Sequence, residues 1–193
     1  MKWYAFLDSE ESSTVNLILD HNTTDYVAWA NSGETTPTVV NAKLQADITN
    51  WNAAVKNTAR LISASEVNKI APLTPFSYDG YDDMGYGVII DVPNWNISDY
   101  NTWYIFHTGN QDEYQGAAGT NKYAWLFDNT DECTTYGCNV ADSGTYGYWT
   151  SSHASNGLAW FVSYGGHLGN YDVAHNGTLG VRPVITISKS IFN

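Results

Sequence analysis

The first hydrophobic runs of the chain, KWYAFLDSE and TVNLILDHNT, are short and are bounded by polar residues. In the second run, Val15, Leu17 and Leu19 alternate with Asn16 and Ile18. A period of two is typical of a β-strand that buries one face. The pattern therefore predicts two short strands at the start of the chain.

From residue 38 onward the hydrophobic period changes to three and four residues. Val40, Leu44, Asp47 or Ile48, and Trp51 recur at these intervals. They would share one stripe of a helix, because an α-helix repeats every 3.6 residues. The spacing predicts a helix over residues 38–51.

The segment ARLISASEVNKIAP carries a second helix signal. Ser63 and Glu66 stand three residues apart, the spacing of a capping box that satisfies free amides at a helix N-terminus. We predict a helix that begins at Ser63, runs through Ile70 and ends before Pro72. Residues 59–62 are predicted to form a strand leading into it.

Beyond residue 72 the regular hydrophobic period is lost. Residues 73–122 scatter Gly, Asp, Asn and Tyr without a sustained period, which indicates long loops with strands at 88–92 and 103–107. Short runs rich in aromatic and β-branched residues follow and predict strands: YAWLFD, YGYWTS, LAWFVSY, HLGNYDV and GVRPVITI. This order predicts an α+β fold with two helices packed on a small antiparallel sheet, and 193 residues suit one domain over 1–193.

Composition and charge narrow the choice of partners. The formal net charge is -12, which repels the phosphates of nucleic acids and anionic membrane surfaces. No run of 18 apolar residues and no signal-peptide pattern occurs, so we expect no membrane insertion. The chain is expected inside a cell, in a phage virion or within a larger secreted protein.

The two cysteines, Cys133 and Cys138, lie in CTTYGC. Their spacing permits a disulfide, and closing so small a ring would stabilise the fold by roughly 2 kcal/mol. Two free thiols in a reducing compartment are the alternative.

Residues 165–166, both glycine, mark a hairpin between two predicted strands. A two-residue turn would pair Tyr164 with His167, whereas a three-residue turn would pair Val162 with Leu168. A slip of one residue exchanges the buried and exposed faces of a strand, so the pattern leaves the register open.

In either register, Trp160, Phe161, Val162, Leu168 and Val173 supply the apolar anchors. The positions expected outside are rich in His, Ser, Asn and Tyr, which is the composition of antibody binding sites. These candidate ligand-binding positions within 150–180 are His153, Ser155, Asn156, Ser163, Tyr164, His167, Asn170, Tyr171, Ala174, His175, Asn176 and Thr178. The alternative is that they are solvated loop residues.

Metal-binding signals are weak. The histidines of this region match no zinc-binding spacing. Asp79, Asp82 and Asp83 form an acidic loop without the Gly and Glu positions of an EF-hand. We expect no cofactor, and a structural calcium ion is the alternative.

Catalytic motifs are also missing from the sequence, because it contains no G-x-S-x-G, P-loop or G-x-G-x-x-G pattern. Arg182 is one of two arginines and lies in an apolar run. We predict that it donates hydrogen bonds to carbonyls or to a buried carboxylate. The alternative partner is a ligand carboxylate. The sequence therefore predicts a protein that is not an enzyme.

Four segments in order, RLISASEVNKI, GYWTSS, AWFVSYGG and GVRPVITI, resemble the C-type-lectin-fold proteins. The likeness is to the branch of formylglycine-generating enzymes and diversity-generating-retroelement variable proteins, in which an RLPT-type strand, a W-S strand and a G-[FV]-R strand follow one another. Residues 60–63, 149–152 and 180–182 stand in those places. The resemblance covers roughly residues 59–187 and implies a C-type-lectin-like fold.

Members of this branch keep the end strands as scaffold and expose the positions between them as a tolerant binding surface. The resemblance thus implies a receptor-recognition module, a variable protein on a bacterial cell surface or phage virion that binds a protein or cell-surface ligand. It implies membership of a larger assembly. The Asn-rich positions fit the adenine-directed mutagenesis of such systems.

Two alternatives accompany this interpretation. Formylglycine-generating enzymes are copper oxidases that use a cysteine pair of the same spacing as Cys133 and Cys138. Their pair lies between the two closing motifs, whereas here it precedes GYWTSS, which favours a local disulfide over an oxidase. The second alternative is a structural pilus or virion component.

Overall fold

The computed structural model describes residues 1–24, 26–71, 73–76, 103–106, 124–127, 130, 145, 147–154, 157–163 and 166–192. Its strands are β1 (Trp3–Phe6), β2 (Thr14–Leu19), β3 (Leu73–Phe76), β4 (Trp103–Phe106), β5 (Gly147–His153), β6 (Leu158–Ser163), β7 (His167–Asp172), β8 (Leu179–Gly180) and β9 (Val184–Ser188). The helices are α1 (Thr38–Asp47), α2 (Ala53–Lys56) and α3 (Ala64–Ile70), with 3-10 turns η2 (Ala124–Leu126) and η4 (Lys189–Phe192). The architecture is α+β, as predicted. The prediction of two helices on one small sheet is wrong, because the described residues form three helices and two sheets. The helix that was not predicted, α2, is a single turn capped by Asn52 and is too short to show a hydrophobic period.

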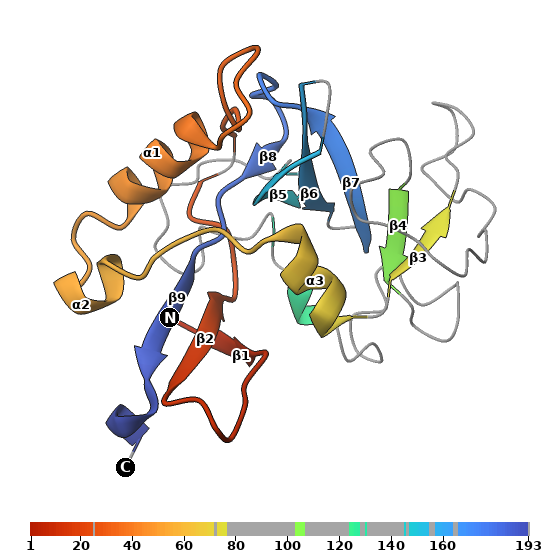
Figure 1. Cartoon of the computed structure of the whole chain (residues 1–193). Helices are drawn as coiled ribbons and strands as arrows, with labels where there is room; N and C mark the ends of the chain where they lie inside the picture. Colours follow the sequence, from red (N-terminus) through yellow and green to blue (C-terminus); the bar gives the residue numbers. More distant parts are fainter. Residues whose placement is uncertain are drawn as a thin grey trace.

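The strands form two sheets (Figure 1). One has three strands in the order β1-β2-β9, and the other has six in the order β3-β4-β7-β6-β5-β8. Every pairing is antiparallel except that of β5 with β8. Because β9 returns to β2, the first and last parts of the described chain share one sheet.

The strands at the centre of the larger sheet are buried on both faces. On β6, Trp160 and Val162 point into a cluster with Ile18 of β2 and Val67 of α3. Phe161, on the opposite face, packs in a second cluster with α1 and residues 27–30. A strand buried on both faces reads as a continuous apolar run, which explains the sequence LAWFVS.

The α1 helix confirms the predicted stripe. Val40, Leu44 and Ile48 are each at most 1% exposed and pack in the second cluster. The helix ends at Asp47, earlier than the predicted end at Trp51. Trp51 is half-buried beyond the helix, where its ring meets Trp3 edge-on with centroids 5.6 Å apart.

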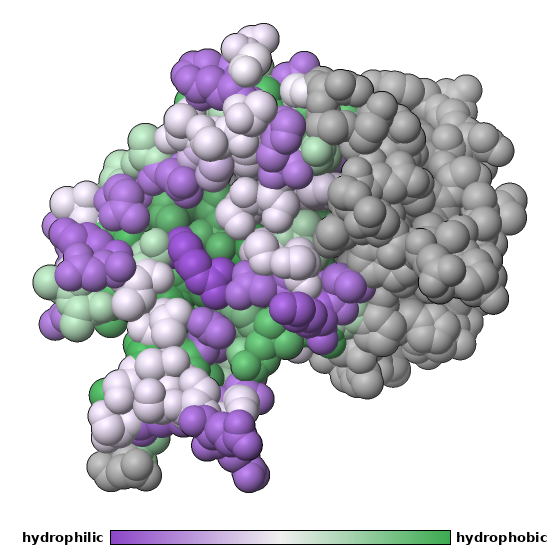
Figure 2. Space-filling view, in the orientation of Figure 1, coloured by the Kyte–Doolittle hydropathy of each residue, from purple (hydrophilic) through white to green (hydrophobic). Residues whose placement is uncertain are grey.

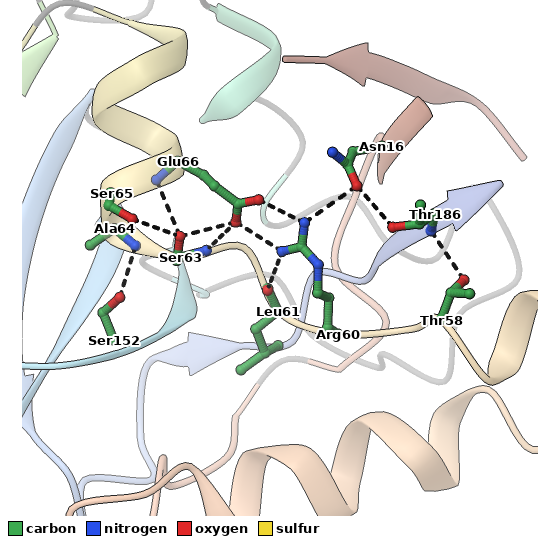
Figure 3. Close-up of polar contacts among 10 residues, drawn as sticks. All are labelled: Asn16, Thr58, Arg60, Leu61, Ser63, Ala64, Ser65, Glu66, Ser152 and Thr186. Atoms are coloured by element: carbon green, nitrogen blue, oxygen red, sulfur yellow. Dashed lines mark hydrogen bonds and ion pairs between the residues drawn. The ribbon is translucent and has the colours of Figure 1, made fainter. Parts of the chain in front are cut away.

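The α3 helix confirms the predicted capping box (Figure 3). Ser63 Oγ accepts from the Glu66 amide at 3.2 Å, and the Ser63 amide donates to the Glu66 carboxylate at 2.9 Å. Arg60 adds two parallel bonds to that carboxylate, at 2.8 and 2.7 Å. Burial alone would raise the pKa of Glu66, but the hydrogen bonds from Arg60 and Ser63 outweigh burial and lower it.

The prediction of a strand over residues 59–62 is wrong. The segment makes a single bridge, between Arg60 and Val184 of β9. Two residues further along β9, the Thr186 amide donates to a side chain, the hydroxyl of Thr58, at 3.0 Å. A side-chain oxygen thus takes the place of the next ladder bond, so no strand is built.

The prediction that YAWLFD forms a strand is also wrong, because residues 124–126 form the 3-10 turn η2. The turn aims the carbonyls of Trp125 and Leu126 at Arg182, whose Nη2 and Nη1 donate to them at 2.8 Å each. The predicted strand at 103–107 is confirmed as β4 over Trp103–Phe106. The predicted strand at 88–92 lies outside the described residues.

Arg182 is fully buried and confirms its predicted structural role. Besides the η2 carbonyls, it donates to Leu19 O at 2.6 Å and to Asp20 O at 2.9 Å. Its guanidinium lies 5.1 Å from the ring centroid of Tyr148. Burial raises the pKa of the Tyr148 hydroxyl to about 12, although the nearby Arg182 opposes this, so Tyr148 stays neutral. Arg182 therefore joins β2, η2 and the segment before β9.

Candidate ligand-binding surface

The β6–β7 hairpin has the register of the three-residue turn. Val162 pairs with Leu168, and Ser163 pairs with His167, which leaves residues 164–166 between them. Gly166 has a φ of 79°, in the left-handed region that such three-residue turns require at one position. The register left open by the sequence is thereby decided.

This register places two candidate residues inside. Ser163 is 4% exposed and His167 is 7% exposed, so the expectation that they lie outside is wrong. The physical reason is that β4 pairs with β7 and brings Ile105 opposite His167. This end of the hairpin is thus an interior part of the sheet instead of a free ribbon.

His153 and Asn170 are half-buried. The His153 ring packs on the indole of Trp29 with centroids 5.9 Å apart, and Asn170 pairs with Trp160 in the sheet. Neither His153 Nε2 nor Asn170 Nδ2, both buried, has a hydrogen-bond partner among the described residues. Both side chains contribute to the scaffold more than to a contact face. Three further candidates lie outside the described residues: Ser155, Asn156 and Tyr164.

The remaining candidates gather where β7 leads into β8. Tyr171 is 38% exposed, and its ring meets Phe161 and His175 edge-on at centroid distances of 6.5 and 4.5 Å. His175 in turn forms a 3.0 Å hydrogen bond through Nε2 with Thr178 Oγ1. Edge-on aromatic pairs are each worth about 0.5–1.5 kcal/mol, so the exposed ring of Tyr171 is held in place.

The backbone of this turn is tied down on three sides. Val173 is buried, its amide donates to Gly157 O at 2.8 Å, and its carbonyl accepts from the Ala30 amide at 2.9 Å. The carboxylate of Asp172 accepts from the Ala174 amide at 2.7 Å. Exposed side chains therefore project from a fixed main chain.

Tyr26 joins this region and was missed by the sequence analysis. It is 40% exposed. The amide of the next residue, Val27, donates to Leu179 O at 3.0 Å, which brings Tyr26 beside the end of the turn. No local pattern could have found it, because well over a hundred residues separate Tyr26 from the turn in the sequence. We name the resulting face the β7–β8 turn surface, composed of Tyr26, Tyr171, Ala174, His175, Asn176 and Thr178.

The character of this surface is polar and uncharged at most positions. In the space-filling view, purple and white residues predominate over the upper part of the molecule, where the loop before α1 and the β7–β8 turn lie (Figure 2). Ala174 and Asn176 are exposed, whereas His175 and Thr178 are half-buried. Such a face suits contact with a partner through aromatic area and small hydrogen-bonding groups.

The described residues show neither a metal-binding cluster nor a membrane-spanning helix. Among the described residues, no group of three or more His, Cys, Asp or Glu side chains is placed to hold a metal ion. None of the described helices is long and apolar enough to cross a membrane. Two further predictions lie outside the described residues: the disulfide between Cys133 and Cys138, and the acidic loop of Asp79, Asp82 and Asp83.

No protein-family model matches the sequence, and no curated protein or solved structure matches it either.

Proposed function

We propose that this protein is a non-catalytic recognition module that binds a protein or cell-surface ligand through the β7–β8 turn surface. The observation that carries the proposal is the setting of Tyr171, whose exposed ring is braced by Phe161 and His175. A rigid aromatic group offers contact area at a small entropic cost. Small polar groups beside it supply adaptable hydrogen bonds.

The proposal extends to the family and setting. We propose a single C-type-lectin-like domain over residues 1–193, of the branch that contains diversity-generating-retroelement variable proteins, at a bacterial surface or in a phage virion. Two features support it: the motifs of residues 60–63, 149–152 and 180–182, and a turn whose exposed positions sit on an anchored backbone. The surrounding DNA tests the retroelement part. We expect a near-repeat of the codons for residues 150–182, differing at adenines and lying beside a reverse transcriptase gene.

Binding is tested with the labelled protein on a panel of intact bacterial cells. Tyr171→Ala should weaken binding at least tenfold, because truncation of a central aromatic anchor typically costs about 2 kcal/mol or more. The melting temperature should fall by roughly 4–8 °C, since the substitution removes two edge-on ring contacts worth about 1 kcal/mol each.

The matched control is His167→Ala, which truncates a candidate that the structure buries. It should lower the melting temperature more than Tyr171→Ala does, while the folded fraction binds like the wild type. Undiminished binding by Tyr171→Ala and Asn176→Ala together would contradict the proposal. A structural pilus or virion role predicts instead that this face binds only neighbouring subunits of its own assembly.

A further inference from the structure

No described segment pairs with the outer edge of strand β1. The Asp20 amide donates to Lys2 O at 3.0 Å, and the register pairs Trp3 with Leu19 and Ala5 with Leu17. In an antiparallel ladder, hydrogen-bonded and non-hydrogen-bonded pairs alternate. Lys2 belongs to a bonded pair, so Trp3 and Ala5 belong to the non-bonded ones. The N–H and C=O groups of Trp3 and Ala5 therefore point away from β2.

The two edges of the small sheet differ. At the β9 edge, Val184 exchanges main-chain bonds with Arg60, at 2.8 and 2.9 Å, and the Thr186 amide is satisfied by Thr58. At the β1 edge, the sheet order ends, and no described segment pairs beyond it. Ala5 is exposed to solvent. An exposed strand edge is a template for a further strand.

An apolar groove adjoins this edge. It has a volume of about 460 Å³ and is lined by Ala5, Asp8, Val15, Leu17, Lys189 and Phe192. Phe192 in its lining is 67% exposed. Two apolar residues next to lining residues in the sequence are also exposed, Ile191 by 64% and Leu7 by 41%. The free edge and the apolar surface thus lie together, a combination that marks protein contact sites.

The sequence of β1 and its flanks is complementary to itself. In the segment KWYAFLD, antiparallel pairing about Ala5 sets Lys2 opposite Asp8, Trp3 opposite Leu7 and Tyr4 opposite Phe6. The charged ends attract each other and the interior pairs are apolar, which is the cross-strand pattern that stabilises sheets. Within one copy, Lys2 lies 3.4 Å from Asp20 and Asp8 lies 2.6 Å from Lys189, but 57% of the Lys2 side chain and 51% of the Asp8 side chain stay exposed.

We propose that β1 pairs antiparallel with β1 of a second copy of this chain, about a two-fold axis at Ala5. The pairing joins the two small sheets into one continuous sheet and covers part of each apolar groove. Lys2 of each copy then lies near Asp8 of the second copy, just beyond the shared ladder, which ends at Phe6. The interface is isologous, so it closes as a dimer and does not propagate.

The expected dimer is weak. Leu7 leaves the strand through a left-handed backbone, with a φ of 48°, so the shared ladder is short. Small interfaces of this kind are typically transient, and we expect a dissociation constant of about 0.1–1 mM. The net charge of -12 on each copy adds repulsion, which salt at about 0.15 M screens beyond roughly 8 Å.

The test is analytical ultracentrifugation of the full chain in about 0.15 M salt. Protein concentrations up to about 1 mM cover the dissociation constant expected for a small interface. The wild type should show a monomer–dimer equilibrium. Ala5→Pro should weaken it at least tenfold with an unchanged circular dichroism spectrum, because the N–H that it removes points away from β2 and proline is tolerated at such edge positions. A wild type that stays monomeric, or a folded Ala5→Pro variant that dimerises normally, would overturn the proposal.

Two further variants test the register and do not depend on the proline. Asp8→Lys should weaken dimerisation by apposing two positive charges. Glu10→Lys makes the same charge change on the neighbouring exposed loop and should not weaken it. Lys189→Met breaks the same Asp8–Lys189 ion pair that Asp8→Lys breaks, and it should not weaken dimerisation either. Ala5→Cys should form a disulfide between the introduced thiols of the two copies under mild oxidation, identified by peptide mapping. Bonded antiparallel pairs hold Cα atoms about 5.5 Å apart, within disulfide range. Equal effects of the two lysine variants, or no linkage between the two copies of Ala5→Cys, would overturn the register about Ala5.

Discussion

Replacing Arg182 with methionine tests the structural role of the buried arginine. Its four donated bonds to carbonyls, of Leu19, Asp20, Trp125 and Leu126, measure 2.6–2.9 Å. Methionine fills similar space but donates nothing, so these carbonyls lose their partner. Each buried polar group left unsatisfied costs about 1–3 kcal/mol. The total for four carbonyls is reduced because the structure relaxes around methionine and because no charge has to be buried. We therefore expect the free energy of unfolding to fall by about 4 kcal/mol.

The assay is urea unfolding followed by tryptophan fluorescence at pH 7, with the free energy extrapolated to zero urea. The free energy of unfolding of Arg182→Lys should lie between those of the wild type and Arg182→Met, because an ammonium group keeps the charge but cannot reach all four carbonyls. If Arg182→Met leaves no folded protein, the lysine variant still gives a measurable value.

The matched control is the other arginine, Arg60, whose side chain is 37% exposed where it binds Glu66. Arg60→Met should cost about 1 kcal/mol, because water reaches this partly exposed ion pair and can replace its hydrogen bonds. Equal losses for Arg60→Met and Arg182→Met, within about 0.5 kcal/mol, would refute the reasoning that burial and bond count set the difference.

Three further predictions concern backbone crowding, helix capping and pH. Gly180→Ala should lower the free energy of unfolding by about 3 kcal/mol, because the added Cβ would stand 2.1 Å from Thr24 O. In the control Gly177→Ala, the added Cβ would stand 3.2 Å from the ring of His175, and the free energy should change by less than about 0.5 kcal/mol. Ser63→Ala should lower it by about 1 kcal/mol through loss of the α3 cap, and an unchanged melting temperature would argue against the capping box. Burial lowers the pKa of His21 from 6.5 to about 4. Between these values the unfolded chain binds more protons than the folded one, so the free energy of unfolding should fall as pH drops from 6.5 toward 4. A His21 imidazole NMR resonance that titrates near 6.5 in the folded protein would contradict this.

Local features of the fold were predictable from sequence where neighbouring residues decide the outcome. The capping box of Ser63 and Glu66 needs only residues three apart, and the stripe of Val40 and Leu44 needs only a helical period. The structural role of Arg182 also followed, since an arginine in an apolar run must find oxygen partners. These predictions were confirmed because the capping box and the helical stripe join residues that are close in sequence. The prediction for Arg182 was confirmed because a buried guanidinium must replace its lost water with hydrogen-bond partners.

The binding surface depended on contacts between distant segments. Pairing of β4 with β7 put His167 inside the sheet, and the Val27–Leu179 hydrogen bond brought Tyr26 to the turn. Arg182 drew the η2 carbonyls into a turn where the sequence pattern favoured a strand. The sequence by itself determined which segments are apolar, where α1 and α3 begin and that the fold is α+β. Only the tertiary structure decided the hairpin register and which polar side chains reach solvent, because a strand's exposed face depends on the strands beside it, and these come from elsewhere in the chain.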